Sequence, residues 1–567
     1  DPGYAIAWSN RSVALHALRR YAEAVDSCER ALLAEPAHAD AFYNRGNALQ
    51  ALRRDADAVA SYDRALALRP DYAKAHTNRG NALYALKRYE EALAAYDRAL
   101  ALTPHAAEAL SNRGNVLGSL GDLDEAIRSY RRALAVSPAD PRVHHALIFA
   151  LLRSAADAED VRAQCAAFAE CFEHRSTPLE HRNSAVPTRR LKVGYVSADF
   201  RAHSVAWHIA PVLENHDPQA VEVYCYFNHP DHDPMTERLM KLPVHWREVA
   251  DLTDVAFASL VQQDGIDILV DLAGHTTHSR LVAFARRPAP LQVTWLGLPA
   301  TTGLSSIDYR ITDDSVDPVG RTEHYQSERL VRLSTHACYQ PPHALLCATA
   351  RSASGIPENS GRLPPVNDLP ALSRGYVTFA SFNELDKISP ATCALWASVL
   401  REVPDSRLLV VCEPSAAKRA RERFIAAGIS AERLKLEDKR PLADYLKLHN
   451  EVDVALDPFP FNGGTVTRNA LWMGVPVITL AGTMPVSRVG LALMTQLGLD
   501  AFVAKTPDEY VQIAARCARD PGALAEIRRS LRRLMEEAPF SNCAAYTREL
   551  EAAYRWMWET WCAQAAA

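Results

Sequence analysis

The chain has 567 residues, of which 48% are hydrophobic and 23% are charged, and its formal net charge is −5. This length predicts roughly three to four domains, and the balanced charge argues against a nucleic-acid partner, which would usually show a basic domain or stripe. The 11 cysteines are dispersed and odd in number, which favours reduced thiols and a cytoplasmic location over a disulfide framework. No apolar run reaches the ~18 residues of a bilayer-spanning helix, so no membrane partner is expected.

Residues 1–140 carry a pattern that recurs every 34 residues. The run Asn-Arg-Gly-Asn begins at Asn44, Asn78 and Asn112, and a degraded copy begins at Asn10. Small residues at fixed places and a proline closing each unit are typical of tetratricopeptide (TPR) repeats, which are pairs of helices. A single unit cannot bury its apolar face alone, so the units must stack into a superhelix. The first helix of each clear repeat is predicted near residues 40–52, 74–86 and 108–120.

The same four asparagines recur once per repeat and are expected to form a ladder along the inner groove of the superhelix. An amide side chain can both donate to and accept from a peptide backbone. This predicts a sequence-tolerant grip on an extended peptide, although the asparagines fit packing between the repeats equally well.

Residues 141–190 are predicted to form a helical cap and a polar linker. From residue 191 the sequence changes to short apolar runs that alternate with helical stretches, which predicts a parallel sheet with helices on both faces. The predicted strands of this first lobe, residues 191–340, are 191–196, 221–226, 266–272, 291–295 and 309–311.

Residues 341–375 are rich in proline, serine and alanine and are predicted to be a linker. The alternation then resumes over residues 376–567, with a helix near 546–561 that is expected to pack back onto a lobe. The predicted strands of this second lobe are 376–380, 407–411, 434–436, 452–456 and 475–480. Two successive α/β sheets without a GxGxxG fingerprint predict a two-lobed enzyme with a cleft between the lobes.

The loop after the first strand of the first lobe is one candidate site, because ligands of open α/β sheets bind beyond the carboxyl ends of the strands. It holds Asp199 and His203, and His208 follows on the next helical turn. An Asp–His pair can orient an imidazole for acid–base chemistry. A histidine that only caps or packs fits the same positions.

Two loops of the second lobe are candidates for anion binding. Lys387 follows the first strand, where a cation can neutralise a phosphate, although a lysine beside acidic residues is also typical of a solvated salt bridge. Asn462–Thr465 follows the strand at 452–456 and precedes a helix. Glycines ahead of a helix leave backbone N–H groups unpaired, and the helix dipole favours an anion there.

Two patterns that suggest metal sites are weak. Asp231-His232-Asp233 has the DxD form of metal-bound sugar-nucleotide sites, but it lies in a polar, proline-rich stretch that favours a solvated loop. His275 and His278 have a metal-like spacing without an evident third ligand. No metal site is therefore predicted.

Five motifs follow the repeats in order, at residues 194–200, 287–292, 295–297, 382–388 and 462–465. In these motifs the chain resembles the protein O-GlcNAc transferase family, and over nearly its whole length it is similar to a bacterial homologue. The resemblance implies TPR repeats followed by a GT-B fold, in which two Rossmann-like lobes face a cleft. It further implies UDP-GlcNAc as the donor, Ser/Thr hydroxyls of proteins as acceptors, inversion to a β-linkage, and neither a metal nor a cofactor.

The resemblance also implies roles for individual residues. Lys387 matches the lysine that contacts the nucleotide diphosphate, and Thr465 matches a phosphate-binding threonine. Asp199 and His203 match the loop beside the sugar, where His203 is a candidate base, and His145 of the cap is a second candidate base. The sugar-pocket loop matches Leu296, Gly297 and Pro299. The remaining donor-site positions are His208, Glu384, Asn462, Gly463, Gly464, Val466 and Asn469.

The chain departs from the family pattern within the nucleotide pocket. Gly464 stands where the animal enzymes have a histidine, Val466 replaces a second threonine, and Asn469 replaces the aspartate that holds the ribose. The other departures are Glu384 for a glutamine, Asp386 for a tyrosine and Tyr445 for a histidine. They leave open another donor, such as the GDP-fucose of the plant branch, another acceptor such as asparagine, or a TPR scaffold that binds a sugar nucleotide with little or no turnover.

Overall fold

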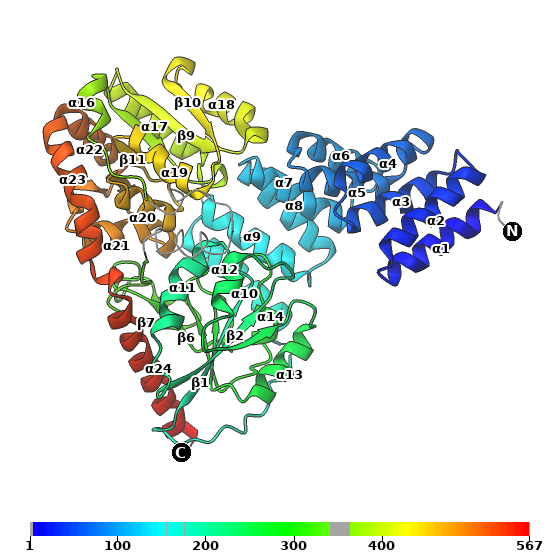
Figure 1. Ribbon diagram of the computed structural model, residues 1–567, viewed down its shortest axis with the longest axis horizontal. Coiled ribbons are helices and arrows are strands. Elements are labelled where there is room, and N and C mark those ends of the chain that lie inside the picture. Colours follow the sequence, from blue (N-terminus) through cyan, green and yellow to red (C-terminus); the bar gives the residue numbers. More distant parts are fainter. Residues whose placement is uncertain (1–3, 155, 175, 341–362, 566–567) are drawn as a thin grey trace. The chain divides into compact units, whose positions relative to one another are not determined.

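The structure, a computed structural model, describes residues 4–154, 156–174, 176–340 and 363–565 (Figure 1). It divides into two compact units, one that ends at Val143 and includes Pro414–Arg419, and one that contains the rest of the chain. The predicted linker at 341–375 lies outside the described residues from 341 to 362. No described helix combines the length and the apolar character that crossing a bilayer requires.

The first unit consists of antiparallel helix pairs, as the repeat predicts. Each clear repeat needs its glycine because the paired helices touch there: a Cβ on Gly46, Gly80 or Gly114 would lie 2.5–2.6 Å from a ring carbon of the repeat's buried tyrosine. The helices are α1 (Ala5–Ala17), α2 (Tyr21–Ala34), α3 (Ala39–Ala51), α4 (Asp55–Leu68), α5 (Ala73–Ala85), α6 (Tyr89–Leu102), α7 (Ala107–Ser119) and α8 (Leu123–Val136).

The second unit begins with two helices of the predicted cap, followed by the first lobe. The lobe's sheet has seven parallel strands in the order β3-β2-β1-β4-β5-β6-β7. Its strands are β1 (Leu191–Ser197), β2 (Val221–Phe227), β3 (His245–Glu248), β4 (Ile268–Asp271), β5 (Leu291–Thr294), β6 (Tyr309–Thr312) and β7 (Arg329–Arg332). The helices of the cap and lobe are α9 (Pro141–Arg153), α10 (Ala158–Phe172), α11 (Ser204–Asn215), α12 (Pro234–Leu239), α13 (Asp254–Asp264) and α14 (Leu281–Phe284).

The second lobe has six parallel strands in the order β10-β9-β8-β11-β12-β13. They are β8 (Thr378–Ser381), β9 (Arg407–Cys412), β10 (Leu434–Asp438), β11 (Val454–Leu456), β12 (Val477–Leu480) and β13 (Val503–Ala504). The helices are α16 (Pro370–Arg374), α17 (Pro390–Glu402), α18 (Ala417–Ala426), α19 (Leu442–Leu448), α20 (Thr465–Trp472), α21 (Val489–Gln496), α22 (Pro507–Arg519), α23 (Pro521–Glu537) and α24 (Cys543–Ala565). Two Rossmann-like sheets after TPR helices confirm the predicted fold class.

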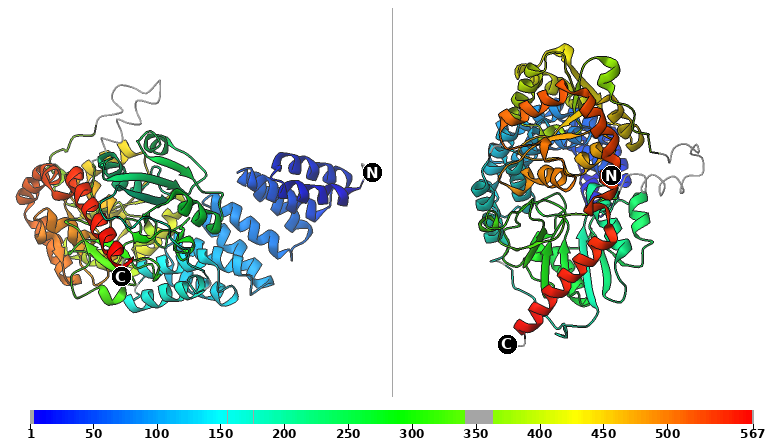
Figure 2. Two further views of the ribbon diagram at one scale, coloured as in Figure 1. Left: turned by 90° about the horizontal axis from the view of Figure 1, so that it is seen from below. Right: turned by 90° about the vertical axis from the view of Figure 1, so that its left-hand side faces the viewer.

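The last helix, α24, follows the second lobe in the sequence but packs on the first lobe (Figure 2). Its buried side chains Tyr546, Leu550, Tyr554 and Trp558 belong to the same apolar core as the strands of the first sheet. The helix therefore closes the first lobe and ties the two lobes together through the chain itself.

Candidate active site

The start of α20 forms the centre of the candidate site. Gly463 cannot carry a side chain, because a Cβ there would lie 2.6 Å from Thr467 Oγ1. Its N–H donates to Asp457 Oδ1 at 2.7 Å, so this amide is not free, which corrects part of the prediction. Within the described residues, the backbone N–H groups of Gly464, Thr465 and Val466 find no acceptor, and no side chain caps the helix. Free amides at a helix start form an anion-binding site.

Lys387 lies beside this helix start, so the two predicted loops of the second lobe come together. Its Nζ is 4.3 Å from the centroid of the Phe461 ring and donates to the Asn462 carbonyl at 3.5 Å. Burial lowers the pKa of Lys387, and the nearby carboxylates of Asp386 and Asp457 oppose that shift.

The side chains of Asn462 and Glu384 have other partners. Asn462 Nδ2 donates to Pro458 O at 3.0 Å and its Oδ1 accepts from Gly490 N at 3.3 Å, which fixes the loop. Glu384 is exposed and pairs with Lys439 at 2.7 Å. In the described residues, neither side chain accepts from the free amides of α20.

One face of helix α9 holds the lysine loop in place. His145, Phe149 and Arg153 are spaced four residues apart and so share that face. Arg153 is buried and forms an ion pair with Asp386, and the Phe149 ring meets the Phe461 ring edge-on at 6.0 Å between centroids. Sequence reasoning missed Arg153, although this spacing in an otherwise apolar helix was a usable signal.

The hydrogen bonds of His145 leave one of its nitrogens free to accept a proton. His275 Nε2 lies 2.8 Å from the carbonyl of Thr302, which can only accept, so the His275 proton is assigned to Nε2. Its Nδ1 then accepts from His145 Nδ1 at 2.8 Å. His145 Nε2 keeps its lone pair and has no partner among the described residues. Burial lowers the pKa of His145 well below its ordinary value, so the ring is neutral.

His203 is bound differently. Its Nδ1 lies 3.4 Å from Asp199 Oδ2, as predicted for an Asp–His pair, but it also accepts from the Val205 N–H at 3.3 Å and so caps α11. While Nδ1 accepts, the neutral ring carries its proton on Nε2 and offers no free lone pair. The His203 side chain is 42% exposed.

His208 connects the first lobe with the start of α20. Its Nδ1 donates to the Cys338 carbonyl at 2.7 Å, and its Nε2 accepts from the Thr465 hydroxyl at 3.2 Å. Burial lowers the pKa of His208 to about 3, so it remains a neutral acceptor. The predicted substrate residues His208 and Thr465 are thus brought into contact.

The remaining pocket positions come from both lobes. Asn469 is buried and its Oδ1 accepts from the Tyr339 hydroxyl at 3.3 Å. Leu296 has a φ of +66°, and a Cβ on Gly297 would lie 2.4 Å from the Ala273 carbonyl. The predicted sugar loop, which ends at Pro299, therefore runs directly against the carboxyl end of β4.

The residues of the DxD pattern have local roles. Asp233 caps α12 and accepts from the Ala202 N–H at 2.6 Å, and His232 pairs with Glu248 at 3.1 Å. No group of three or more potential metal ligands occurs in the described ranges.

The ladder asparagines make contacts between successive repeats. Asn44 Nδ2 donates to Ser9 Oγ at 3.1 Å. Asn78 and Asn112 each donate to the last asparagine of the preceding Asn-Arg-Gly-Asn run, both at 2.8 Å, and Asn10 is exposed. Asn78 Nδ2 also donates to the Tyr43 hydroxyl at 3.1 Å, so packing between repeats uses both donors of that amide and one donor each of Asn44 and Asn112.

Comparison with known proteins places these features in one family. A model described as Glycosyl transferase family 41 matches residues 138–346 and 365–550, and TPR models match residues 5–38, 54–87, 80–121 and 107–140. Two proteins named probable UDP-N-acetylglucosamine–peptide N-acetylglucosaminyltransferase SPINDLY, from Hordeum vulgare and Arabidopsis thaliana, are each 41% identical to the chain over 67% and 66% of its length.

The chain spans only 39% and 40% of those two plant proteins. A solved structure of a mutant Thermobaculum terrenum O-GlcNAc transferase is 36% identical, has a TM-score of 0.82, and matches 93% of this chain and 98% of that one. The similarity therefore extends over both the repeats and the two lobes.

Proposed function

Because the chain belongs to glycosyl transferase family 41, we propose that it transfers GlcNAc from UDP-GlcNAc to Ser and Thr hydroxyls of proteins, with inversion and without a metal. The observation that carries this proposal is the convergence of Lys387 with the free amides of Gly464, Thr465 and Val466. A cation and a helix start at one point suit a diphosphate leaving group.

The second lobe would stabilise the leaving diphosphate. As the bond between the anomeric carbon and the diphosphate oxygen breaks, negative charge develops on that oxygen. Fixed donors aimed at such charge are worth several kcal/mol in a site that excludes water. Lys387 and the start of α20 supply these donors, and Arg153 holds the lysine loop through Asp386.

His145 is the better placed of the two candidate bases. The acceptor hydroxyl oxygen would bond to the anomeric carbon on the face opposite the diphosphate, and its proton would pass to His145 Nε2. His275 holds the tautomer that leaves this nitrogen free. His203 could act only after releasing the Val205 N–H and donating from Nδ1 to Asp199 instead.

Protein acceptors follow from the TPR repeats, whose asparagine ladder would hold an extended peptide. We expect the triple change of Asn44, Asn78 and Asn112 to Ala to raise the KM for a protein acceptor while donor hydrolysis stays the same. Because these amides also join the repeats, the melting temperature of the variant must be measured alongside. An unchanged acceptor KM in a folded variant would refute the ladder.

A different donor is the second candidate, and Asn469 is the observation that favours it. A carboxylate is absent at this pocket position, and the amide oxygen is already bound to Tyr339. A pocket altered in this way supports GDP-fucose or another sugar nucleotide. A scaffold with little turnover is the remaining alternative.

Calorimetry with UDP, UDP-GlcNAc, GDP and GDP-fucose tests the donor, and hydrolysis of the sugar nucleotide that binds tests turnover. The proposal expects UDP and UDP-GlcNAc to bind, the latter to be hydrolysed slowly, and both to lose affinity in Lys387→Ala. Preference for GDP-fucose would establish the second candidate. Binding without hydrolysis or transfer would indicate the scaffold, and no binding at all would reject every one of these functions.

A further inference from the structure

Arg468 is a buried cation in the second turn of α20. Its side chain is 1% exposed, and its Nη2 donates to His336 Nε2 at 3.2 Å. Its Nε has no hydrogen-bond partner, and within the part of the chain that the structure describes no carboxylate forms an ion pair with it. A buried charge without an opposite charge is costly, by several kcal/mol per ion.

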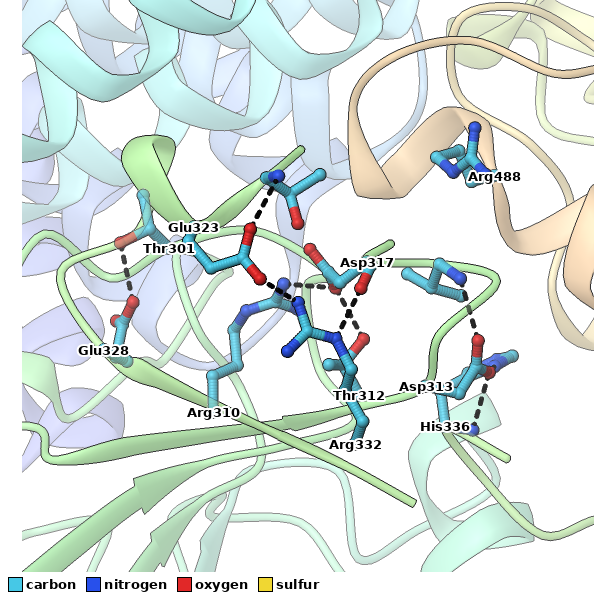
Figure 3. Close-up of polar contacts among 12 residues, drawn as sticks. Thr301, Arg310, Thr312, Asp313, Asp317, Glu323, Glu328, Arg332, His336 and Arg488 are labelled. Carbon is cyan, nitrogen blue, oxygen red and sulfur yellow. Dashed lines mark hydrogen bonds and ion pairs between the residues drawn. The ribbon is translucent and has the colours of Figure 1, made fainter. Parts of the chain in front are cut away.

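Asp313 and His336 of the first lobe contact each other (Figure 3), and His336 in turn orients the guanidinium of Arg468. Asp313 Oδ2 accepts from His336 Nδ1 at 2.8 Å and from the His336 backbone N–H at 2.9 Å. Because a guanidinium only donates, His336 Nε2 must accept from Arg468. The imidazole therefore lies between the carboxylate of Asp313 and the cation, and the two charges do not meet directly.

The guanidinium points back toward the free amides of α20, as helix side chains tilt toward the amino terminus. Its Nη1 lies 3.9 Å from the place that a Cβ on Gly464 would occupy, and no other atom outside Gly464 and its chain neighbours lies within 4 Å of that place. The glycine thus leaves space where a side chain would begin, and the Arg468 cation borders that space. Burial lowers the pKa of Arg468 to about 10, which keeps the group charged at neutral pH.

We propose that Arg468 binds the diphosphate of the donor through the space beside Gly464, as a second cation opposite Lys387. His336 and Asp313 are positioning residues that hold the guanidinium at this place. The inference rests on the proposed function, since it concerns the same anion, but it adds a residue that neither the family match nor the motifs assign. It implies that the site binds a diphosphate strongly even without a base or a sugar, and that the released nucleoside diphosphate inhibits the next turnover.

Inorganic pyrophosphate is the probe that isolates this contact, because it carries no base or sugar. Calorimetry on the full chain should show that Arg468→Met weakens pyrophosphate binding about tenfold to a hundredfold, the range for a hydrogen bond to a charged group. Arg468→Lys keeps the charge but loses the planar fork, and it should fall between the wild type and Arg468→Met. Arg532→Met is the matched control, because Arg532 donates to the Trp472 carbonyl at the other end of α20, at 3.0 Å, and it should leave pyrophosphate affinity unchanged.

Melting temperatures measured with and without pyrophosphate separate binding from folding. Removal of an unpaired buried charge should leave the melting temperature of Arg468→Met unchanged or higher, while the increase on adding pyrophosphate becomes smaller. If Arg468 were purely structural, the Arg468→Met variant would have a lower melting temperature than the wild type, and pyrophosphate would raise that temperature by the same amount as in the wild type. Arg468→Lys supplies the same readout if Arg468→Met does not fold.

The outcomes distinguish this inference from the proposed function. Equal pyrophosphate affinity in the wild type, Arg468→Lys and Arg468→Met would overturn the role of Arg468. If Lys387→Ala also lost binding in that experiment, the proposed function would stand and only this inference would fall. If the wild type bound neither pyrophosphate nor any nucleoside diphosphate, both would fall together.

Discussion

The two sides of the candidate site use opposite kinds of electrostatics. The second lobe presents permanent positive character through Lys387, Arg468 and the unpaired amides of α20. The cap and first lobe present imidazoles in which hydrogen bonds commit one ring nitrogen as a donor, while the other is an acceptor that is left free only in His145. These imidazoles are His145, His208, His275 and His336.

Burial explains how both conditions coexist in one site. It disfavours the charged form of any group, so the pKa of His208 falls to about 3 and that of His275 to about 4. The same effect lowers the pKa of Arg468 only to about 10, and the arginine stays charged. Burial in low-dielectric surroundings therefore keeps these histidines as acceptors and the arginine as a cation over the same pH range.

The largest expected effect comes from removing the cation beside α20. Lys387→Ala should reduce transfer, measured as kcat/KM for the donor, by about 10³-fold, because the developing charge loses a cationic side-chain donor. His203→Ala should lose much less, since its Nδ1 caps a helix. Initial rates of the two variants check this order. A greater loss in His203→Ala would show that the second lobe does not make the main electrostatic contribution.

His145 should give the next largest effect. His145→Gln should lower kcat by about 10²-fold, within the range for general-base catalysis, with unchanged UDP affinity. Because burial lowers the pKa of His145, the wild-type rate should not decline on the acid side until well below pH 6.5. If His203→Gln costs more than His145→Gln, or if the acid limb lies near pH 6.5, the base is not His145.

The neutral state of His208 can be measured through stability. Its pKa is about 3 in the folded protein and ~6.5 when unfolded, so below pH 6.5 the unfolded state binds more protons and the free energy of unfolding decreases as the pH falls. Between pH 7.5 and pH 5 this group alone should cost about 2 kcal/mol.

The comparison that isolates this contribution is His208→Gln against the wild type in urea at both pH values. The variant should have a lower free energy of unfolding than the wild type at pH 7.5. The difference between the two should be smaller at pH 5 by the contribution of His208, about 2 kcal/mol. A gap that does not change with pH would mean that His208 is not held neutral.

The smallest effect concerns the ion pair that supports the lysine loop. Arg153→Met should lower kcat/KM by about tenfold, roughly 1.4 kcal/mol, because Asp386 is released and Lys387 loses its fixed position. Asp386→Asn is the matched control, because it removes the same ion pair by changing the acidic partner. If the two single variants and the double variant are equally impaired, the residues act as a pair, whereas additive losses would contradict that coupling.

Much of the architecture was predictable because its signals are local. The 34-residue repeat and the alternation of apolar runs with helical stretches depend on neighbouring residues alone, and every predicted strand is present. The strands missed by sequence reasoning, β3, β7 and β13, lie at sheet edges or are two residues long. Edge strands are half exposed and lack the apolar run that marks a buried strand.

The sequence by itself determined the order of the domains and the two loops that place Lys387 and Thr465 at carboxyl ends of strands, since chain direction and strand order suffice for that rule. Only the tertiary structure decided which nitrogens are free. The tautomer of His145 depends on its hydrogen bond to His275, about 130 residues away. Arg468 has no carboxylate partner because the imidazole of His336 lies between it and Asp313. Such partners come from distant segments, and their hydrogen bonds exist only once the lobes are folded together.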